Sequence, residues 1–412
     1  MRIQKISNYL LQIGAVLAIL WIPVIADKPY NFKKGKDTMN QSVIINGKKF
    51  SNWQNTSFIP ASGAIKGNEL WISTSSDVNN ADSPYHLCIA DNSLITVYPQ
   101  WIDARNAETG DRDWTQKFIN LMDFTLDSEG IWVISAGNKF YKRTVQNQKT
   151  EEIHIALFTQ YPKVFFISSE KEFFFYIYNK YPSSFDQPVL DDGFTITNFN
   201  VKERKVAYEY NENNILITGF ALSNNQKTCF LTTDNNLYSF PVSISSDKDI
   251  TKTDFPFIRS LSVYSDGNLI AAQDIDKNQK IPEPKNRRIV SLTPDGKINW
   301  EVPINELSKS GQPPAFASGG NIYYCAGSTL LCIKDSKTEW EYEVSGGNTE
   351  KYLTVLQDQS VLVAALNMLH HIDSNGTLIK SIVNPFVITC RPIIDTTGKV
   401  YVAGKEGVRC LE

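Results

Sequence analysis

The sequence lacks a strong charge of either sign. Its 41 Lys and Arg residues are nearly balanced by 44 Asp and Glu residues, which leaves a formal net charge of -3. Without a global positive field the chain has no means of holding phosphate backbones nonspecifically, so nucleic-acid binding is disfavoured. Hydrophobic residues make up 42% of the chain, which is ample for a folded core. The composition is therefore typical of a globular protein without a nucleic-acid partner.

Helical periodicity is absent too. After residue 40 no apolar pattern with the helical period lasts for more than a turn. Short alternating or wholly apolar segments recur instead, and aromatic residues make up 12% of the chain. Both features favour β-strands. The sequence therefore predicts an all-β fold.

Catalytic and cofactor motifs are also missing. The chain has no Gly-x-Ser-x-Gly elbow and no glycine-rich phosphate loop. His370 and His371 are consecutive on a predicted strand and so point to opposite faces, while His86 and His154 have no ligand partner at the usual spacing. The segment DIDKN, from Asp274, starts like a calcium loop but lacks the Gly and Glu that such a loop requires. We predict no catalytic residue, no metal site and no cofactor.

The N-terminus has the outline of a secretory signal. Arg2 and Lys5 precede an apolar run over residues 10–26, and small residues at its end place a cleavage site ahead of Asp27. The alternative is an uncleaved signal anchor, since the run is only slightly shorter than the roughly 20 residues that span a bilayer. Lysines that follow the run favour cleavage, because they would lie outside in an anchor. No Cys stands at the cleavage point, so we expect no lipid anchor there.

These features divide the chain into three parts. Residues 1–26 are predicted as a signal peptide or signal anchor, residues 27–41 as a polar linker, and residues 42–412 as the folded domain. We expect an extracytoplasmic protein, periplasmic or secreted, which contacts a membrane only through residues 10–26 if these are not removed.

The folded domain is organised by repetition. In its C-terminal half, pairs of short strands meet at turns built on Asp, Gly or polar residues. These predicted hairpins cover residues 262–273, 289–302, 316–327, 329–344, 356–366, 368–383 and 393–404. Two joined hairpins make a four-stranded antiparallel unit, and equivalent turns recur every roughly 40–50 residues, the length of one propeller blade.

Less regular units surround Glu69, Gly130, Glu172 and Lys227, which makes eight in all. The prediction is a single β-propeller with eight four-stranded blades. In its last unit GVRCLE is the third strand, and no fourth strand follows it. We expect residues 43–53 (VIINGKKFSNW) to pair with this third strand, so that an N-terminal strand closes the ring. The alternative is a pair of β-sandwich domains.

The repeats resemble the pyrroloquinoline-quinone-type propeller repeat. The resemblance covers about residues 255–412 well and residues 58–254 as a strand rhythm. It is carried by Gly320, Tyr323, Tyr324, Cys332, Asp335 and Trp340, by Asp295, Gly296 and Trp300, and by Gly398, Tyr401 and Val402, while Asp373 and Gly376 keep the turn without the Trp. Among secreted proteins the chain is most similar to the propeller of the outer-membrane β-barrel assembly scaffold. That resemblance implies a binding protein without catalysis, although the lipid-carrying Cys of that family is absent.

The repeat also accounts for the cysteines. Cys88, Cys332 and Cys410 are expected at equivalent places in different blades, too far apart to bond with one another. Cys325 and Cys332 lie on adjacent predicted strands, where a diagonal disulfide is geometrically poor. We therefore expect buried free thiols. No two Cys are sequence neighbours, whereas quinone dehydrogenases place a vicinal disulfide against the cofactor, so a quinone site is disfavoured.

Loop lengths distinguish the two faces of the predicted propeller. Long connections are expected at 75–84, 179–193 and 274–287 within blades and at 99–120 and 244–254 between blades, all on one face. Loops longer than roughly a dozen residues in a compact domain are usually functional. The predicted partner-binding residues on them are of types common at interfaces, namely Trp101, Asp103, Arg105, Arg112, Trp114, Tyr181 and Phe185. The alternative is that these side chains pack against neighbouring blades.

The sequence thus predicts an exported, non-catalytic propeller that binds a protein or another cell-envelope component through its long-loop face. The alternative is a propeller enzyme of the quinone-dependent dehydrogenase, lyase or sulfotransferase type. Such an enzyme requires His, Arg or acidic groups that converge at the mouth of the central channel.

Overall fold

The structure is a computed structural model. It describes residues 44–45, 65–74, 83–90, 92–118, 121–127, 130–135, 139–143, 150–154, 162–167, 173–180, 193–200, 203, 205–213, 215, 217–223, 225, 227–256, 258–264, 266–275, 285–306, 313–317, 319–346 and 349–412. The chain divides into two compact units, Met1–Asn40 and Gln41–Glu412. Every described residue lies in the second unit, to which the following account refers.

Within the described residues the strands form eight antiparallel sheets, which we number I to VIII. Sheet I contains β1 (Ile44–Ile45), β3 (His86–Ala90), β4 (Ser93–Val97), β5 (Trp101–Asn106) and β6 (Arg112–Lys117). Sheet II contains β7 (Leu121–Asp127), β8 (Gly130–Ser135), β9 (Lys139–Arg143) and β10 (Thr150–His154). Sheet III contains β11 (Pro162–Ile167), β12 (Phe173–Lys180), β13 (Gly193–Asn200) and β14 (Lys205–Asn213). Sheet IV contains β15 (Ile217–Leu222), β16 (Thr228–Thr233), β17 (Asn236–Pro241) and β18 (Thr251–Asp254), with a 3-10 turn, η2 (Asp247–Asp249), before β18.

The C-terminal half forms the other four sheets. Sheet V contains β19 (Ile258–Val263), β20 (Leu269–Asp274), β21 (Lys285–Leu292) and β22 (Ile298–Glu306). Sheet VI contains β23 (Ala315–Phe316), β24 (Ile322–Ala326), β25 (Thr329–Lys334) and β26 (Lys337–Glu343). Sheet VII contains β27 (Lys351–Val355), β28 (Val361–Ala365), β29 (Met368–Ile372) and β30 (Leu378–Val383). Sheet VIII contains β31 (Ile393–Ile394), β32 (Val400–Gly404), β33 (Gly407–Leu411) and, from far earlier in the chain, β2 (Glu69–Thr74).

All seven hairpins predicted in the C-terminal half are confirmed, from β19–β20 to β31–β32. Their turns form from local chemistry. In the turn between β31 and β32 the Asp395 carboxylate accepts hydrogen bonds from the backbone N–H groups of Thr397 and Lys399. Gly398 follows with a φ of +89°, a left-handed conformation that glycine adopts without strain.

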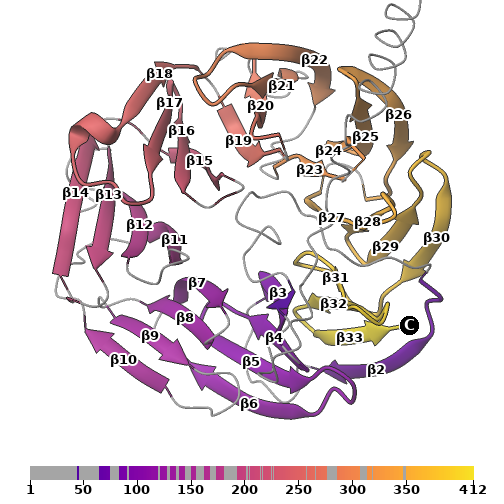
Figure 1. Ribbon diagram of the computed structural model, residues 1–412. Helices are drawn as coiled ribbons and strands as arrows, with labels where there is room; N and C mark the ends of the chain where they lie inside the picture. Colours follow the sequence, from indigo (N-terminus) through magenta and orange to yellow (C-terminus); the bar gives the residue numbers. More distant parts are fainter. Residues whose placement is uncertain are drawn as a thin grey trace, which may run out of the picture. The chain divides into compact units, whose positions relative to one another are not determined.

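Strand order within each sheet follows the chain, and in Figure 1 the first strand of each sheet lies towards the centre and the last at the rim. Sheet VIII departs from this rule, because β2 supplies its outermost strand by pairing with β33. The prediction that residues 43–53 supply this strand is therefore wrong. Ile44–Ile45 pairs with β3 on the inner side of sheet I, and residues 46–53 lie outside the described residues.

A repeated aromatic contact explains why β2 takes this place. Within sheet VI, Trp340 lies opposite Cys332 on the outermost strand, and Trp71 of β2 lies opposite Cys410 in the same way. Each indole covers a glycine in a turn of the following sheet: a Cβ built on Gly376 would lie 2.7 Å from the Trp340 ring, and one on Gly110 would lie 2.6 Å from the Trp71 ring. The segment 69–74 thus carries the outer-strand residue that docks one sheet on the next.

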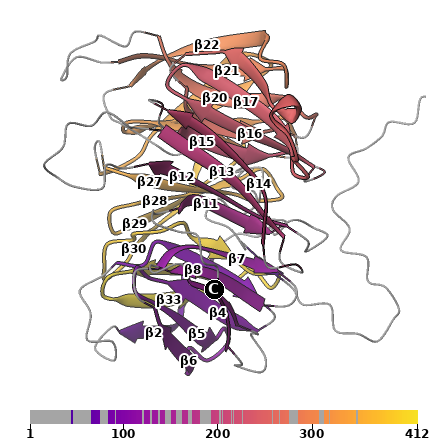
Figure 2. The same ribbon diagram turned by 90° about the vertical axis from the view of Figure 1, so that its left-hand side faces the viewer.

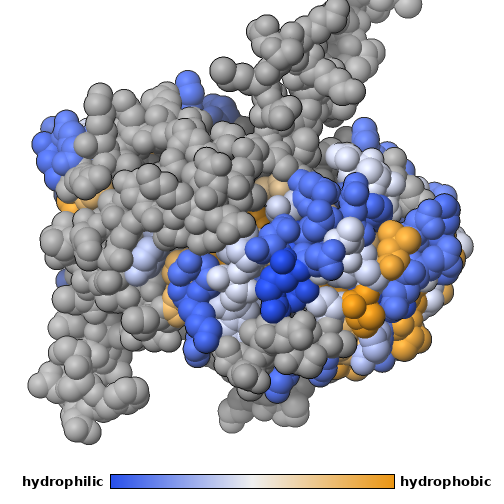
Figure 3. Space-filling model, turned by 90° about the horizontal axis from the view of Figure 1, so that it is seen from below, coloured by the Kyte–Doolittle hydropathy of each residue, from blue (hydrophilic) through white to orange (hydrophobic). Residues whose placement is uncertain are grey.

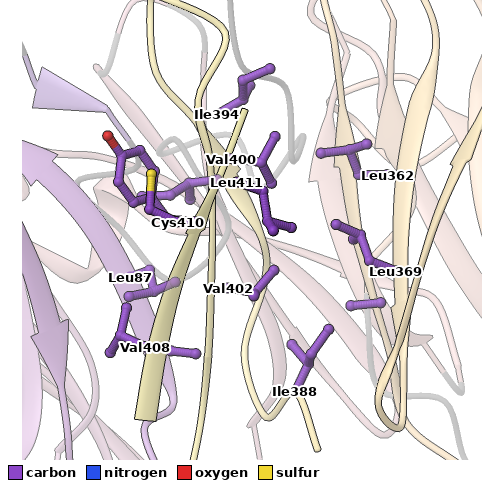
Figure 4. Close-up of a cluster of buried hydrophobic side chains, with 14 of the residues drawn as sticks. Leu87, Leu362, Leu369, Ile388, Ile394, Val400, Val402, Val408, Cys410 and Leu411 are labelled. Atoms are coloured by element: carbon purple, nitrogen blue, oxygen red, sulfur yellow. The ribbon is translucent and has the colours of Figure 1, made fainter. Parts of the chain in front are cut away.

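The core lies between the sheets. Figure 2 shows from the side how β13 and β14 lie beside β15 and β16, and the apolar side chains of these two sheets form one buried cluster. Similar clusters join sheet I to II, IV to V, V to VI and VI to VII, and β7 lies against β11. The largest cluster among the described residues joins sheets VII, VIII and I (Figure 4); among its members are Leu87, Leu362, Leu369, Ile388, Val400, Val402 and Val408. Sheet VIII therefore packs against both its predecessor and sheet I.

Candidate functional site

The five residues predicted on the loop over 99–120 lie on paired strands. Trp101, Asp103 and Arg105 belong to β5, and Arg112 and Trp114 to β6. All but Arg112 are buried, and Trp101 is 1% exposed. The prediction of a long exposed loop here is wrong, because these residues form paired strands and the first five residues of β5 are buried.

Asp103 is the centre of a buried ionic cluster. Its Oδ2 accepts from Nε of Arg105 at 2.7 Å, and its Oδ1 accepts from Nε of Arg112 at 2.8 Å and from the Thr115 hydroxyl at 2.6 Å. Arg105 also donates through Nη1 to the Gly110 carbonyl at 3.1 Å. Charges this deep in a protein are tolerated when they are paired and hydrogen-bonded, as here.

This ionic cluster supports the contact between sheets VIII and I. Gly110 is the glycine under the Trp71 ring, and the Ala107 carbonyl accepts hydrogen bonds from both Trp71 Nε1 and the Tyr401 hydroxyl, each at 3.2 Å. These buried side chains pack inside the protein, which is the alternative that the sequence left open for them. Arg112 keeps 28% of its side chain exposed. Partner binding by this group stays a prediction, and Tyr181 and Phe185 lie outside the described residues.

Two of the five predicted long connections, 179–193 and 274–287, join second to third strands within a sheet, as expected. Residues 75–84 were expected within a blade, but that prediction is wrong, because they lead from β2 of sheet VIII to β3 of sheet I. Antiparallel pairing brings these two kinds of connection to the same face. The segment 244–254 was expected there but joins β17 to β18, a third-to-fourth connection that belongs to the opposite face.

The histidines of sheet VII point to opposite faces of β29, as predicted. His370 has its Nε2 2.8 Å from the hydroxyl of Ser345, in the connection after β26 of sheet VI. His371 has its Nε2 2.9 Å from the Ser360 hydroxyl, which itself donates to Asp358 at 2.6 Å. Burial lowers the pKa of both imidazoles. Both side chains thus hold neighbouring segments of the protein and remain neutral near pH 7.

All six cysteines are free and buried. Burial raises the pKa of Cys332, Cys390 and Cys410 to about 12, so these thiols stay protonated and unreactive in the folded protein. The predicted equivalence holds for Cys332 and Cys410, which lie on third strands opposite Tyr323 and Tyr401. It is wrong for Cys88, which lies on β3, the first of the four consecutive strands of sheet I.

Among the described residues no group of three or more His, Cys, Asp or Glu side chains could hold a metal ion. Nor does that part of the chain contain a helix with the length and apolar character needed to cross a membrane. In DIDKN, Asp274 is buried and pairs with Arg287, Nε to Oδ1, at 2.8 Å, while Asp276 and Asn278 lie outside the described residues.

The exposed apolar side chains are concentrated in one region. Nine large hydrophobic side chains among the described residues are exposed, and seven of them belong to β2, β30 and the connections around β29 and β30. We call these seven the β30/β2 patch; they are 38% to 64% exposed and comprise Leu70, Ile72, Leu366, Leu378, Ile379, Val383 and Val387. Figure 3 shows hydrophobic areas of this kind among the hydrophilic surface. Clustered apolar exposure on a folded protein commonly marks an interaction site.

Hydrogen bonds connect the parts of the patch across sheets VII and VIII. Arg409 lies opposite Ile72 in the β2–β33 ladder, forms an ion pair with Glu69 at 2.8 Å, and donates to the carbonyl of Val383 at 3.1 Å. The Ile388 N–H donates to the Leu366 carbonyl at 2.7 Å. Leu366 and Val387, which precedes Ile388, therefore lie together, next to the end of β30.

The charges beside the patch neutralise each other. Arg409 pairs with Glu69, and Lys66 pairs with Glu412 at 2.8 Å. The outermost strand of sheet VI is different: Glu339, Glu341 and Glu343 are exposed on β26. Charged outer strands discourage strand-to-strand association, and β30 has Lys380 as its one charged residue.

Sequence reasoning missed the β30/β2 patch, although a signal was present. LIKSIV and ELWIST resemble core strands, whereas the equivalent strand of sheet VI, KTEWEYE, alternates charged with aromatic residues. A comparison of the outermost strands of the repeats, aligned with one another, would have shown that two of them carry apolar residues where a third carries Glu.

Comparison with known proteins supports the architecture. No protein-family model matches the chain, and no curated protein sequence matches it. The crystal structure of BamB from Moraxella catarrhalis is similar, with a TM-score of 0.56 at 9% sequence identity over 84% of this chain and 96% of that chain. The fold is that of a β-propeller. At this identity the similarity concerns the fold alone.

Proposed function

We propose that this chain is an exported, non-catalytic propeller scaffold that binds a protein of the cell envelope through the β30/β2 patch. The observation that carries the proposal is the concentration of exposed Leu, Ile and Val side chains on the outer strands of sheets VII and VIII. The neutral balance of the ion pairs beside the patch favours a partner with an apolar contact surface.

The patch extends the face expected from the sequence. Leu366 lies in the second-to-third strand connection of sheet VII and Val387 in the connection from sheet VII to VIII, which are the two kinds of loop on the long-loop face. The remaining residues continue from there along β30 and β2. In this proposal the partner contacts the edge of the long-loop face and the adjoining rim.

Export and the scaffold role rest on the sequence and on the fold similarity. The segment from Arg2 to Ala26 supports export, with the periplasm or the exterior as the destination. The pyrroloquinoline-quinone-like repeats and the BamB-like fold support a binding role of the kind found in assembly-scaffold propellers. The partner that we propose for this chain is a protein of an envelope assembly machinery.

We further propose that the eight sheets are the eight blades of one ring, closed by β2 in place of residues 43–53. Two backbone hydrogen bonds support the closure, from Gly67 N–H to the Glu412 carbonyl at 2.6 Å and from Glu412 N–H to the Asn68 carbonyl at 2.9 Å. They join β33 to β2 at the place where a covalent turn joins the third to the fourth strand in the other sheets.

The test replaces Ile72 and Val383 together by Ser. Single exposed side chains contribute less than about 0.5 kcal/mol to folding, so the double variant should keep its melting temperature. A partner is first identified by crosslinking of the wild type in cell envelopes and then purified. We expect the variant to bind it at least about 10-fold more weakly, because apolar anchors dominate interface energies.

The matched control replaces Glu341 and Glu343 on β26 by Ser and should bind the purified partner like the wild type. Equal binding by the wild type and the Ile72/Val383 variant would refute the patch as the partner site. Loss of binding in the β26 variant alone would place the partner on sheet VI instead.

A further inference from the structure

The turn between β29 and β30 combines an exposed asparagine with a glycine that packing requires. The Asp373 carboxylate accepts from the backbone N–H groups of Asn375 at 2.9 Å and Thr377 at 2.8 Å. Gly376 has a φ of +84°. The Asn375 side chain is exposed, and no described residue forms a hydrogen bond with its amide group. The Asn375 amide is therefore not held by the described protein, whereas the Gly376 N–H donates to the Asp373 carbonyl at 3.1 Å and must release that bond before its nitrogen attacks.

Trp340 of sheet VI determines the glycine. A Cβ built on Gly376 would lie 2.7 Å from Cδ2 of the Trp340 ring, closer than real Cβ contacts come. The indole Nε1 donates to the Ser374 carbonyl in the same turn at 2.9 Å. The contact between sheets VI and VII thus depends on the backbone path of this turn, and the residue after Asn375 cannot carry a side chain.

An Asn–Gly pair can react with itself. The backbone nitrogen of Gly376 attacks Cγ of Asn375 and loses its proton, the bond from Cγ to the side-chain nitrogen breaks, and ammonia leaves. Water then opens the cyclic imide at one of its two carbonyls, which gives aspartate or isoaspartate. Glycine favours the attack because no Cβ shields its nitrogen.

We propose that Asn375 is a site of deamidation in the folded protein, and that its conversion to isoaspartate displaces Trp340 from the turn and loosens the contact between sheets VI and VII. Isoaspartate adds a methylene to the main chain between residues 375 and 376. The added length shifts Gly376 relative to Ser374, and the indole cannot keep both its stacking on the glycine and its hydrogen bond.

Two other turns place a glycine directly against a side chain of a neighbouring sheet, but neither contains an Asn–Gly pair. Thr109 precedes Gly110 under Trp71, and Asp295 precedes Gly296, whose built Cβ would lie 2.8 Å from Cγ2 of Thr253 on β18. Threonine has no side-chain carbonyl for the nitrogen to attack. The reaction is therefore expected at the turn of sheet VII and not at the turn of sheet I.

The experiment ages the full-length folded protein in mildly alkaline buffer, which favours attack by the backbone nitrogen. The peptide that contains Asn375 is then examined by mass spectrometry for the mass change from amide to acid and for isoaspartate. Asn375→Gln is the matched control, because its longer side chain cyclises far more slowly. A second Asn–Gly pair, Asn46–Gly47, is an internal reference outside the described residues.

We expect isoaspartate at position 375 in the aged wild type, together with a lower melting temperature, and neither change in aged Asn375→Gln. Asn375→Asp, which adds the charge without lengthening the backbone, should melt close to the unaged wild type. Conversion only in a urea-unfolded sample, or conversion of Asn46 without Asn375, would overturn the assignment. Full conversion with unchanged melting, or an equal loss of stability in Asn375→Asp, would overturn the displacement of Trp340.

Discussion

The strand β2 provides the sharpest test of how the sheets are held in place. It is joined to β33 by backbone pairing and by contacts of its side chains, with no covalent turn between the two strands. Trp71 is its main anchor, since the indole packs against Gly110 and Tyr401 and donates to the Ala107 carbonyl. We predict that Trp71→Ala releases β2 locally before the rest of the protein unfolds.

The expected magnitude follows from these contacts. Replacing a fully buried Trp by Ala costs roughly 3–5 kcal/mol, and the cost falls for a side chain that is partly buried, as Trp71 is. The indole hydrogen bond adds about 1 kcal/mol. Together these losses lower the free energy of opening β2 by about 3 kcal/mol. Because about 1.4 kcal/mol corresponds to a factor of ten, opening becomes about 100-fold more frequent.

Amide hydrogen exchange measured by mass spectrometry checks this value in peptides that cover β2 and β33. Both strands should exchange about 100-fold faster in Trp71→Ala, while β28 and β29 of sheet VII keep their protection. Leu70→Ala is the matched control on the same strand, because Leu70 is 44% exposed and its loss leaves no cavity. Unchanged protection of β2 in the Trp71 variant, or equal acceleration in the Leu70 variant, would refute the role assigned to the indole.

Three further predictions follow from the buried polar groups. Asp103→Asn should lower the free energy of unfolding in urea by about 3 kcal/mol, because it leaves a buried guanidinium without its carboxylate, whereas Glu203→Gln at an exposed ion pair should change it by less than about 0.5 kcal/mol. Burial holds the pKa of His371 below its usual value, so as the pH falls the imidazole is protonated in the unfolded chain at a higher pH than in the folded protein. The melting temperature should therefore fall as the pH drops below about 6.5, and it should fall less steeply in His371→Gln. Native protein should resist thiol alkylation at pH 8 and react with six equivalents of reagent only when unfolded, and rapid labelling of the native state would contradict the burial of Cys88, Cys229, Cys325, Cys332, Cys390 and Cys410.

The hairpins were predictable because each of them is decided within a few residues. Asp395 and Gly398 form their turn through the bonds of one carboxylate and one left-handed glycine, and nothing distant is needed. Strand alternation and repeat length then indicate sheets of four strands and the propeller class. The burial of the thiols also follows from strand patterns, although the place of Cys88 in its sheet does not.

Tertiary structure alone decided which strand completes sheet VIII. ELWIST and VIINGKKFSNW both resemble strands, and the choice depends on whether Trp71 meets a glycine in sheet I, far along the chain. The same holds for the residues around Asp103, which resemble an interface in the sequence because Trp and Arg are common there. In the structure the Asp103 carboxylate accepts hydrogen bonds from the buried Arg105 and the partly exposed Arg112 beneath that same contact, so the buried ion pair is formed within the protein.

For the β30/β2 patch, too, the strands follow from local sequence whereas the exposure of their side chains does not. The sequence determined that Ile72 and Val383 lie on strands, because their apolar neighbours and bounding turns are local properties. Whether such side chains are covered depends on which sheet lies beside them, and no further sheet of the described residues pairs with the outermost strands of sheets VII and VIII. Local chemistry therefore determined the strands and turns of this protein. The contacts between sheets, made by residues far apart in the chain, decided which side chains hold one sheet on the next and which remain exposed.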